Sequence, residues 1–179
     1  RKNDMEKFVA TIEFYPEEGR YHLDGHRICK TVFSPDESKK YNKICPVCSK
    51  PLTIGVMNRI EELAKRRAGY KPNKYRPFTH LVSLEKIIGE AMDLGPATKG
   101  VFAVYDEMLK NLGPEIKILT EIPENEFLSV VQPLVAEGIK RVREEKVKFE
   151  PAGYDGEYGR ISIFTAQERN NISPQTALL

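Results

Sequence analysis

The sequence predicts an α+β fold in which a small β-rich module is followed by a helical domain that carries a β-hairpin. Three observations lead to this prediction. Short stretches rich in aromatic and β-branched residues open the chain, apolar residues recur at helical spacing after Leu81, and all three cysteines surround one polar loop between Gly25 and Lys50. A chain of 179 residues suffices for one ordinary domain or two small ones.

Residues 1–78 form the expected first domain. The stretch KFVATIEFYP has the alternation and composition of a β-strand, and GRYHLDGH after it predicts a turn and a short partner strand. In TIGVMNRIEELAKRR, apolar residues at helical spacing predict a trailing helix. This helix is expected to begin at Thr53 or Gly55 and to end at Gly69.

Residues 79–165 form the expected second domain. SLEKIIGEAMD predicts a helix with Ser83 as its N-cap, and TKGVFAVYDEMLKNLG predicts another that closes at Gly113. EIKILTEIP is expected to be a strand, and ENEFLSVVQPLVAEGIKRVREEK to be mostly helical, with Pro133 as a kink or as the true helix start. VKFEPAGYDGEYGRISIF predicts a β-hairpin around a glycine-rich turn, and the polar residues 166–179 are expected to be a mobile tail.

The composition is that of a soluble globular protein, and it narrows the possible functions. No apolar run approaches the roughly 18 residues that span a membrane, so no membrane partner is expected. The sequence shows no signal peptide, which favours a reducing, cytoplasmic location. Three cysteines are an odd number, which argues against a disulfide framework and for metal binding. A glycine-rich phosphate loop followed by Lys is absent, so an ATPase activity has no support.

The charge of the chain is small in total but unevenly spread. The net charge is +2, whereas the stretch from Lys39 to Arg76 holds eleven Lys or Arg and two Glu, a local charge of +9. This asymmetry favours a basic face for a polyanion, although a solvated lysine-rich surface would give the same count.

The cysteines have the spacing of a metal site. His26 and Cys29 are separated by two residues, as are Cys45 and Cys48, so each pair forms a knuckle that can aim two ligands at one ion. Three thiolates and one imidazole complete a closed tetrahedron, which indicates a structural rather than a catalytic zinc ion and a zinc-ribbon-like β module. His22 is the alternative fourth ligand. Because a loop-rich segment buries little apolar surface, the metal is expected to supply its folding energy.

Four stretches of the chain resemble one known family. EFYPEEGRYHLDGHRIC, CPVC, KPLTIGVMNRIEELAKR and GYDGEYGRI, taken in this order, are similar to the C-terminal part of endonuclease Q, and the resemblance extends from about Glu13 to Phe164. That family comprises archaeal and some bacterial DNA repair nucleases, often labelled helicase-related. Two positions depart from the family pattern, since Ser49 stands where Gly is usual and Asn58 where His is usual.

The resemblance implies a function for the longer protein. Members incise DNA on the 5′ side of deaminated bases or abasic sites, through metal-activated water in an upstream phosphoesterase domain whose motifs this chain lacks. This segment is then expected to have no catalytic residues of its own, to contact the upstream catalytic domain, to grip DNA and to receive the everted base. The alternatives are a zinc-containing module that recruits a protein partner and, with least support, a stand-alone enzyme.

Two further groups of residues are candidates for contact with DNA. A basic and aromatic stretch has the composition of an opened-strand binding surface, or of a linker whose aromatics anchor it to the core. In the turn GYDGEYG, tyrosines offer stacking faces and carboxylates can accept hydrogen bonds from a base edge. The spacing alone favours a plain glycine-rich hairpin turn with surface tyrosines, and the resemblance to the family makes the base pocket an equal alternative. The candidates for DNA contact are Lys65, Arg66, Arg67, Tyr70, Lys71, Lys74, Tyr75 and Arg76, and those for the base pocket are Tyr154, Asp155, Glu157 and Tyr158.

The end of the chain resembles the start of a peptide that binds sliding clamps. Gln175 and Leu178 stand at the spacing of such a peptide, but the paired aromatics that would follow are missing. Because buried aromatic anchors dominate such interfaces, the chain as given is expected to bind a clamp weakly or not at all.

Overall fold

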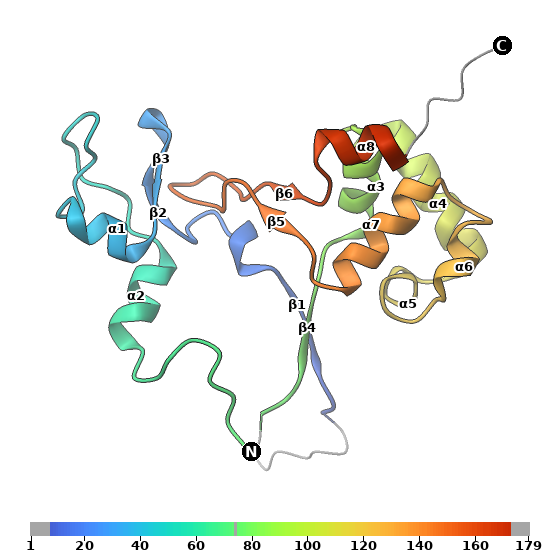
Figure 1. Cartoon of the computed structure of the whole chain (residues 1–179), viewed down its shortest axis with the longest axis horizontal. Coiled ribbons are helices and arrows are strands. Elements are labelled where there is room, and N and C mark those ends of the chain that lie inside the picture. The colour runs from blue at the N-terminus through green and yellow to red at the C-terminus, as the bar shows by residue number, and fades with distance from the viewer. Residues whose placement is uncertain (1–7, 74, 173–179) are drawn as a thin grey trace. The chain divides into compact units, whose positions relative to one another are not determined.

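The computed structural model describes residues 8–73 and 75–172, with the side chains of residues 170–172 left aside (Figure 1). Helices and small two-stranded sheets combine in one chain, so the predicted α+β class is confirmed. The chain divides into two compact units. Unit 1 contains the described residues up to Thr79 together with Phe149–Ile161, and unit 2 contains His80–Lys148 and the described residues from Ser162 onward. Among these residues we find no helix with the length and apolar character that crossing a membrane requires.

Unit 1 is built from short elements around the cysteines. Its helices and strands are β1 (Thr11–Phe14), η1 (Pro16–Glu18), β2 (Asp24–His26), η2 (Arg27–Cys29), β3 (Thr31–Phe33), α1 (Pro35–Lys40) and α2 (Val56–Leu63), with β4 (Phe78–Leu81) crossing into unit 2. The first predicted strand is confirmed as β1. Its predicted partner is wrong, because β2 pairs antiparallel with β3 whereas β1 pairs with β4.

Local sequence signals explain the two helices of unit 1. Helix α1 was not predicted, yet Ser34 and Glu37 form a complete capping box at its start and Pro35 occupies its first position. Helix α2 begins after Gly55, one of the two predicted starts. It ends at Leu63 rather than at Gly69, so the basic residues that follow lie outside the helix.

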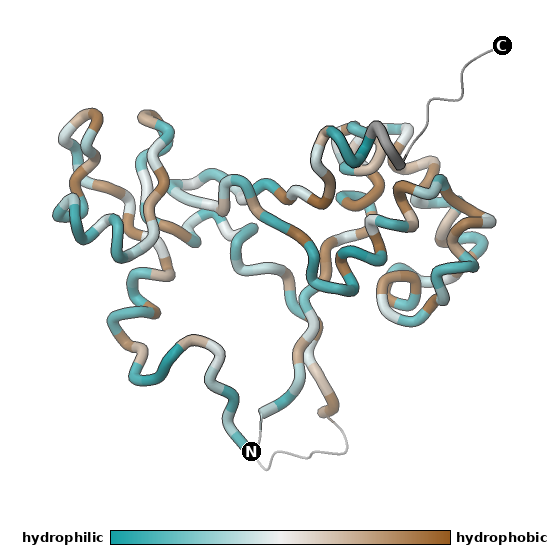
Figure 2. Tube along the Cα trace, in the orientation of Figure 1, coloured by the Kyte–Doolittle hydropathy of each residue, from teal (hydrophilic) through white to brown (hydrophobic). Residues whose placement is uncertain are grey.

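Unit 2 is mainly helical. Its elements are α3 (Leu84–Met92), α4 (Lys99–Leu112), α5 (Glu115–Thr120), α6 (Glu124–Phe127), α7 (Pro133–Arg143) and α8 (Ala166–Ile172), and β5 (Lys148–Phe149) and β6 (Ile161–Ser162) cross between the units. The predicted helices appear as α3, α4 and α7, with Ser83 and Gly113 at the expected boundaries and Pro133 at a true helix start. The fully buried side chains of its core include Ile87, Ile88, Met108, Ile118, Phe127 and Ile139, and Figure 2 shows the hydrophobic residues within these helices in brown.

Two predictions for unit 2 are wrong. The expected strand EIKILTEIP is helix α5, in which Ile118 and Leu119 are buried while Ile116 is half exposed. Residues 166–172 of the expected mobile tail form helix α8. Ion pairs hold α8 in unit 2, because the Arg169 guanidinium lies 3.0 Å from the Glu90 carboxylate and 2.6 Å from that of Asp93.

The predicted β-hairpin exists as β5 and β6, but its loop does not lie in the second domain where the expected boundaries 79–165 placed it. Residues 149–161 belong to unit 1. The Gly153 N–H donates to the Glu17 carbonyl at 2.8 Å, and the Gly153 carbonyl accepts from the Leu23 N–H at 2.9 Å. A Cβ atom at position 153 would lie 2.0 Å from the Gly19 oxygen, so only glycine permits this backbone contact. The hairpin loop thus belongs to unit 1, the unit that contains the predicted metal ligands.

Candidate metal centre and cationic pocket

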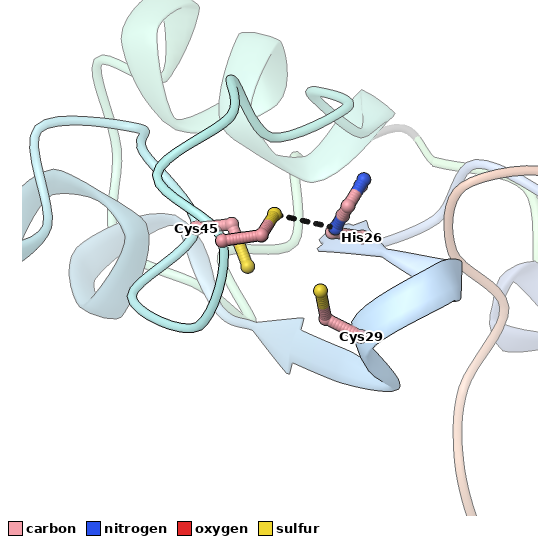
Figure 3. A group of neighbouring side chains, drawn as sticks. His26, Cys29 and Cys45 are labelled. Carbon is pink, nitrogen blue, oxygen red and sulfur yellow. Dashed lines mark hydrogen bonds between the residues drawn. The ribbon is translucent and has the colours of Figure 1, made fainter.

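The four predicted metal ligands lie together in unit 1. His26 ends β2, Cys29 ends η2, and Cys45 and Cys48 belong to the turn that follows α1. Their ligand atoms all lie within 4.8 Å of one another, and the His26 Nδ1 is 3.4 Å from the Cys48 Sγ (Figure 3). His22, the alternative ligand, is not part of this group. The cluster is the single group of three or more His, Cys, Asp or Glu in the described part of the chain that can hold a metal ion.

Both knuckles turn through a residue in the left-handed region of backbone conformation. Lys30 follows Cys29 with a φ of 53°, and Ser49 follows Cys48 with a φ of 57°. The Ser49 N–H donates to the Cys45 carbonyl at 2.8 Å, which closes the second knuckle. Glycine adopts such a φ at no steric cost, which explains why the family usually has Gly at this position. Ser49 keeps the turn with a small conformational cost.

The thiols of the cluster differ in acidity before a metal binds. Burial, together with hydrogen bonds to the thiols of Cys48 and Cys45, raises the pKa of Cys29 to about 11. Burial also opposes ionisation of Cys45, but hydrogen bonds from the backbone N–H groups of Cys48 and Val47 outweigh it and lower the pKa of Cys45 to about 6. The protein thus stabilises the Cys45 thiolate, whereas a metal ion must displace the proton of Cys29.

The donor set fits a closed metal site. Three sulfur atoms and one imidazole nitrogen fill the four positions of a tetrahedron, so no position remains open for water or substrate. A metal bound here would hold β2, η2 and the turn after α1 together, which is a structural role.

A buried polar network supports the strand that carries His26. The Asp24 carboxylate is fully buried and accepts hydrogen bonds from the Gly55 N–H and the Asn58 side-chain amide, each at 2.7 Å, and from the Ser38 hydroxyl. Asn58 is 1% exposed, and its amide oxygen accepts from the Lys43 ammonium at 3.2 Å. The position at which the family usually has His is therefore filled by a residue that anchors α2 to β2, with no surface for a ligand.

A cavity of about 490 Å³ lies beside the metal cluster within unit 1. It is lined by Arg27, Lys30, Val32, Pro151, Tyr154, Glu157, Tyr158 and Arg160. The Tyr154 ring is nearly buried and covers the backbone of Gly25, where a Cβ atom would lie 2.4 Å from the ring. Tyr158 is 67% exposed, and the Arg20 guanidinium lies 5.2 Å from its ring centroid.

The four predicted base-pocket residues have two different roles in this arrangement. Tyr154, Glu157 and Tyr158 line the cavity, whereas Asp155 does not. The Asp155 carboxylate accepts from the Arg27 N–H at 2.7 Å and from the Thr53 hydroxyl at 2.5 Å. Burial opposes its ionisation, but these two hydrogen bonds dominate and lower the pKa of Asp155. Asp155 thus fastens the hairpin turn to the metal knuckle.

Sequence reasoning missed three cations of the cavity, Arg27, Lys30 and Arg160. For two of them the sequence contains a clue to a role near the site, because Arg27 lies between the predicted ligands His26 and Cys29 and Lys30 directly follows Cys29. Arg160 follows the glycine-rich turn directly. Only the return of the hairpin to unit 1 brings these residues to one place, and that long-range contact has no signature in a single sequence.

None of the described residues of the predicted basic and aromatic stretch lines this cavity. These residues are mostly exposed, and they pair a cation with an aromatic ring four residues later. The Arg66 guanidinium is 4.8 Å from the Tyr70 ring centroid, and the Lys71 ammonium is 5.5 Å from that of Tyr75. Arg76 lies 5.6 Å from the ring centroid of Phe8. Lys74, Gln175 and Leu178 are outside the described residues.

The fold and the site define an α+β protein with a His/Cys cluster that can hold a metal ion. The family model of the MJ0043 C-terminal domain matches residues 83–146, within unit 2. The uncharacterized protein MJ0043 of Methanocaldococcus jannaschii is 36% identical over 157 residues, which cover 88% of this chain and 20% of that protein. The uncharacterized protein YqxK of Bacillus subtilis is 29% identical over 160 residues, which cover 88% of this chain and 36% of that protein.

Solved structures connect the chain to one enzyme. The crystal structure of the lesion-specific endonuclease PfuEndoQ from Pyrococcus furiosus matches with a TM-score of 0.74 and 29% identity, over 90% of this chain and 41% of that one. An endonuclease Q complex with a 27-mer duplex substrate, with an abasic lesion at the active site, matches with a TM-score of 0.73 and 30% identity, over 86% and 38% of the two chains. The predicted resemblance to the C-terminal region of endonuclease Q is confirmed. The chain spans about two fifths of these enzymes and less of the curated relatives.

Proposed function

We propose that this chain is the DNA-binding and lesion-recognising C-terminal region of an endonuclease that incises DNA 5′ to deaminated bases or abasic sites. The similarity to endonuclease Q carries the proposal, because it covers 86–90% of the chain and one of the similar structures is a complex with duplex DNA. The catalytic chemistry would belong to a part of the longer protein that this chain does not match. The closed geometry of its one described metal cluster supports this division of labour.

The metal in the cluster is proposed to be zinc with a structural role. Thiolate and imidazole ligands in a closed tetrahedral set are characteristic of structural zinc sites, and the ligand spacing agrees. The bound ion would supply rigidity and folding energy to unit 1, and His26, Cys29, Cys45 and Cys48 would hold it.

In this proposal the basic stretch neutralises phosphates, and its aromatic rings stack on unpaired bases. The test uses Arg66→Ala, Arg67→Ala and Lys71→Ala combined in one chain, with a duplex that carries one uracil or hypoxanthine. The matched control removes three exposed cations of unit 2, with Lys99→Ala, Lys110→Ala and Lys117→Ala.

The basic-stretch variant should bind DNA more weakly, and the slope of log affinity against log salt should decrease by about 0.9 for each duplex phosphate that the variant no longer neutralises. The unit 2 control should change both quantities far less. If affinity and salt dependence fell equally in the two variants, the loss of net charge alone would explain the effect, and a specific role for the basic stretch would be contradicted. Absence of DNA binding by the unaltered chain would contradict the proposed function itself.

One observation favours a second function, a zinc-containing module that binds a protein partner. Helix α2 exposes Val56, Ile60 and Leu63 at 50–60% of their surfaces, and their spacing places them along one face of the helix. An exposed apolar stripe of this kind is typical of interaction surfaces. Replacing Ile60 and Leu63 with Ser should leave DNA affinity unchanged under the DNA-binding proposal. The tail residues Gln175 and Leu178 remain a proposal for contact with a sliding clamp in a longer protein.

A further inference from the structure

Three basic side chains of the cavity in unit 1 form no ion pair in the described part of the chain. Arg27, Lys30 and Arg160 line this cavity, and no described carboxylate forms a salt bridge with any of them. Other arginines, such as Arg141 and Arg169, pair with carboxylates. Three cations that line one cavity without forming a salt bridge repel one another, so this cavity is suited to an anion.

The remaining lining identifies the class of anion. Three cations and the Glu157 carboxylate give the cavity a formal charge of +2. The rings of Tyr154 and Tyr158 lie among these charges, and Tyr158 leaves most of its surface exposed. Cations neutralise phosphates and exposed aromatic rings stack on bases, so together they recognise a nucleotide rather than a carboxylate or sulfate.

We propose that this cavity is a nucleotide site, in which Arg27, Lys30 and Arg160 hold a phosphate while the adjoining base stacks on Tyr158. The inference rests on the proposed function, because it names the part of a DNA strand that unit 1 takes up. The volume of about 490 Å³ is in the range of small-molecule pockets.

The metal knuckle positions two of the three phosphate ligands. Arg27 lies between His26 and Cys29, and Lys30 follows Cys29 at the left-handed turn. The Asp155 carboxylate holds the Arg27 N–H, which fixes the knuckle against the hairpin that supplies Tyr158 and Arg160. A metal that holds the knuckle would therefore also orient the phosphate ligands before DNA arrives.

Nuclear magnetic resonance titration of the ¹⁵N-labelled chain tests the site directly. The ligands are thymidine 5′-monophosphate, thymidine and inorganic phosphate, each added up to about 10 mM. The variant combines Lys30→Gln with Arg160→Gln. Position 30 has a left-handed backbone conformation, which Gln adopts at about the same conformational cost as Lys. Lys110→Gln, an exposed lysine of α4, is the matched control. Metal content and thermal unfolding verify that each variant is folded.

We expect the monophosphate to shift the amide signals of Lys30 and Tyr158, with thymidine at least tenfold weaker. Removing one charge-assisted hydrogen bond should weaken binding about tenfold, so the double variant should bind about a hundredfold more weakly, and Lys110→Gln should bind normally. Unchanged binding by a folded double variant, or shifts confined to unit 2, would overturn the proposal. Equal affinity for inorganic phosphate and the monophosphate would overturn the base-stacking part.

This titration, taken together with the DNA-binding measurement described above, separates this inference from the proposed function. If the chain binds the monophosphate in this cavity but does not bind DNA, the nucleotide site is supported and the DNA-binding function is contradicted. A chain that binds DNA, while the monophosphate shifts no signal of the cavity, would keep the function and contradict the nucleotide site.

Discussion

Replacing Asp155 with Asn should destabilise unit 1 although the substitution changes no cavity-lining residue and leaves the side-chain size almost unchanged. Asp155 accepts from the Arg27 N–H at 2.7 Å and from the Thr53 hydroxyl at 2.5 Å, and its backbone has a φ of 42°, which Asn also tolerates. A hydrogen bond to a charged group contributes about 1.5–3 kcal/mol. Asn lacks the charge and one acceptor oxygen, so we expect the free energy of unfolding to fall by about 2 kcal/mol, a factor of about 30 in the folding equilibrium of this unit.

The measurement must follow unit 1 alone, because unit 2 carries most of the helix and would dominate a circular dichroism signal. Release of the metal to a chromogenic chelator during urea titration reports on the unit that holds His26 and Cys29. Asp106→Asn, an exposed position of α4, is the matched control and should leave the midpoint unchanged. If Asp155→Asn released the metal at the same urea concentration as the unaltered chain, the proposed link between hairpin and knuckle would be wrong.

Three further predictions concern the metal, helix α8 and Tyr158. Cys45→Ser should abolish binding of one zinc per chain and unfold unit 1 while unit 2 keeps its helices, because metal binding and folding of the site are coupled; elemental analysis and circular dichroism check this. Hydrogen bonds from Arg141, and then from the Thr165 N–H, lower the pKa of Glu168 from 4.5 to about 2. The stabilisation of α8 by this carboxylate should therefore be complete above pH 4.5 and disappear as the pH falls toward about 2. Protection of the α8 amides from hydrogen exchange should follow this pH dependence, and Glu168→Gln should remove it. Tyr158→Ala in the full-length protein should reduce the preference for lesion over normal DNA about tenfold in competition binding, and an unchanged preference would assign Tyr158 a structural role.

The sequence predicted best where the signal is local. The ligands of the metal cluster follow from two knuckles of fixed spacing, and the boundaries of α3, α4 and α7 follow from Ser83, Gly113 and Pro133. Each of these signals involves residues that are neighbours along the chain. The capping box of α1 is also local, although the polar stretch that it opens has no apolar periodicity to indicate a helix.

The errors arise where tertiary contacts decide the structure. The stretch EIKILTEIP has β-forming residues, yet burial of Ile118 and Leu119 on one side favours helix α5. Helix α8 is polar, and its ion pairs with residues about 76–79 positions earlier could not be predicted from composition. The cationic cavity combines residues 27–32 with residues 151–160, so only Tyr154, Glu157 and Tyr158 of its eight lining residues were predicted.

The order in which the chain passes through the two units determines which fragments contain a complete unit. The chain enters unit 2 after Thr79, returns to unit 1 at Phe149 and leaves it again after Ile161. A fragment cut at residue 78 would retain every metal ligand but lack Tyr154 and Asp155, which close one side of the metal knuckle. Each unit is made of two segments that are separated in the sequence, so no single continuous stretch of the chain contains a whole unit. A fragment meant to contain one whole unit must therefore be assembled from two separate segments of the sequence.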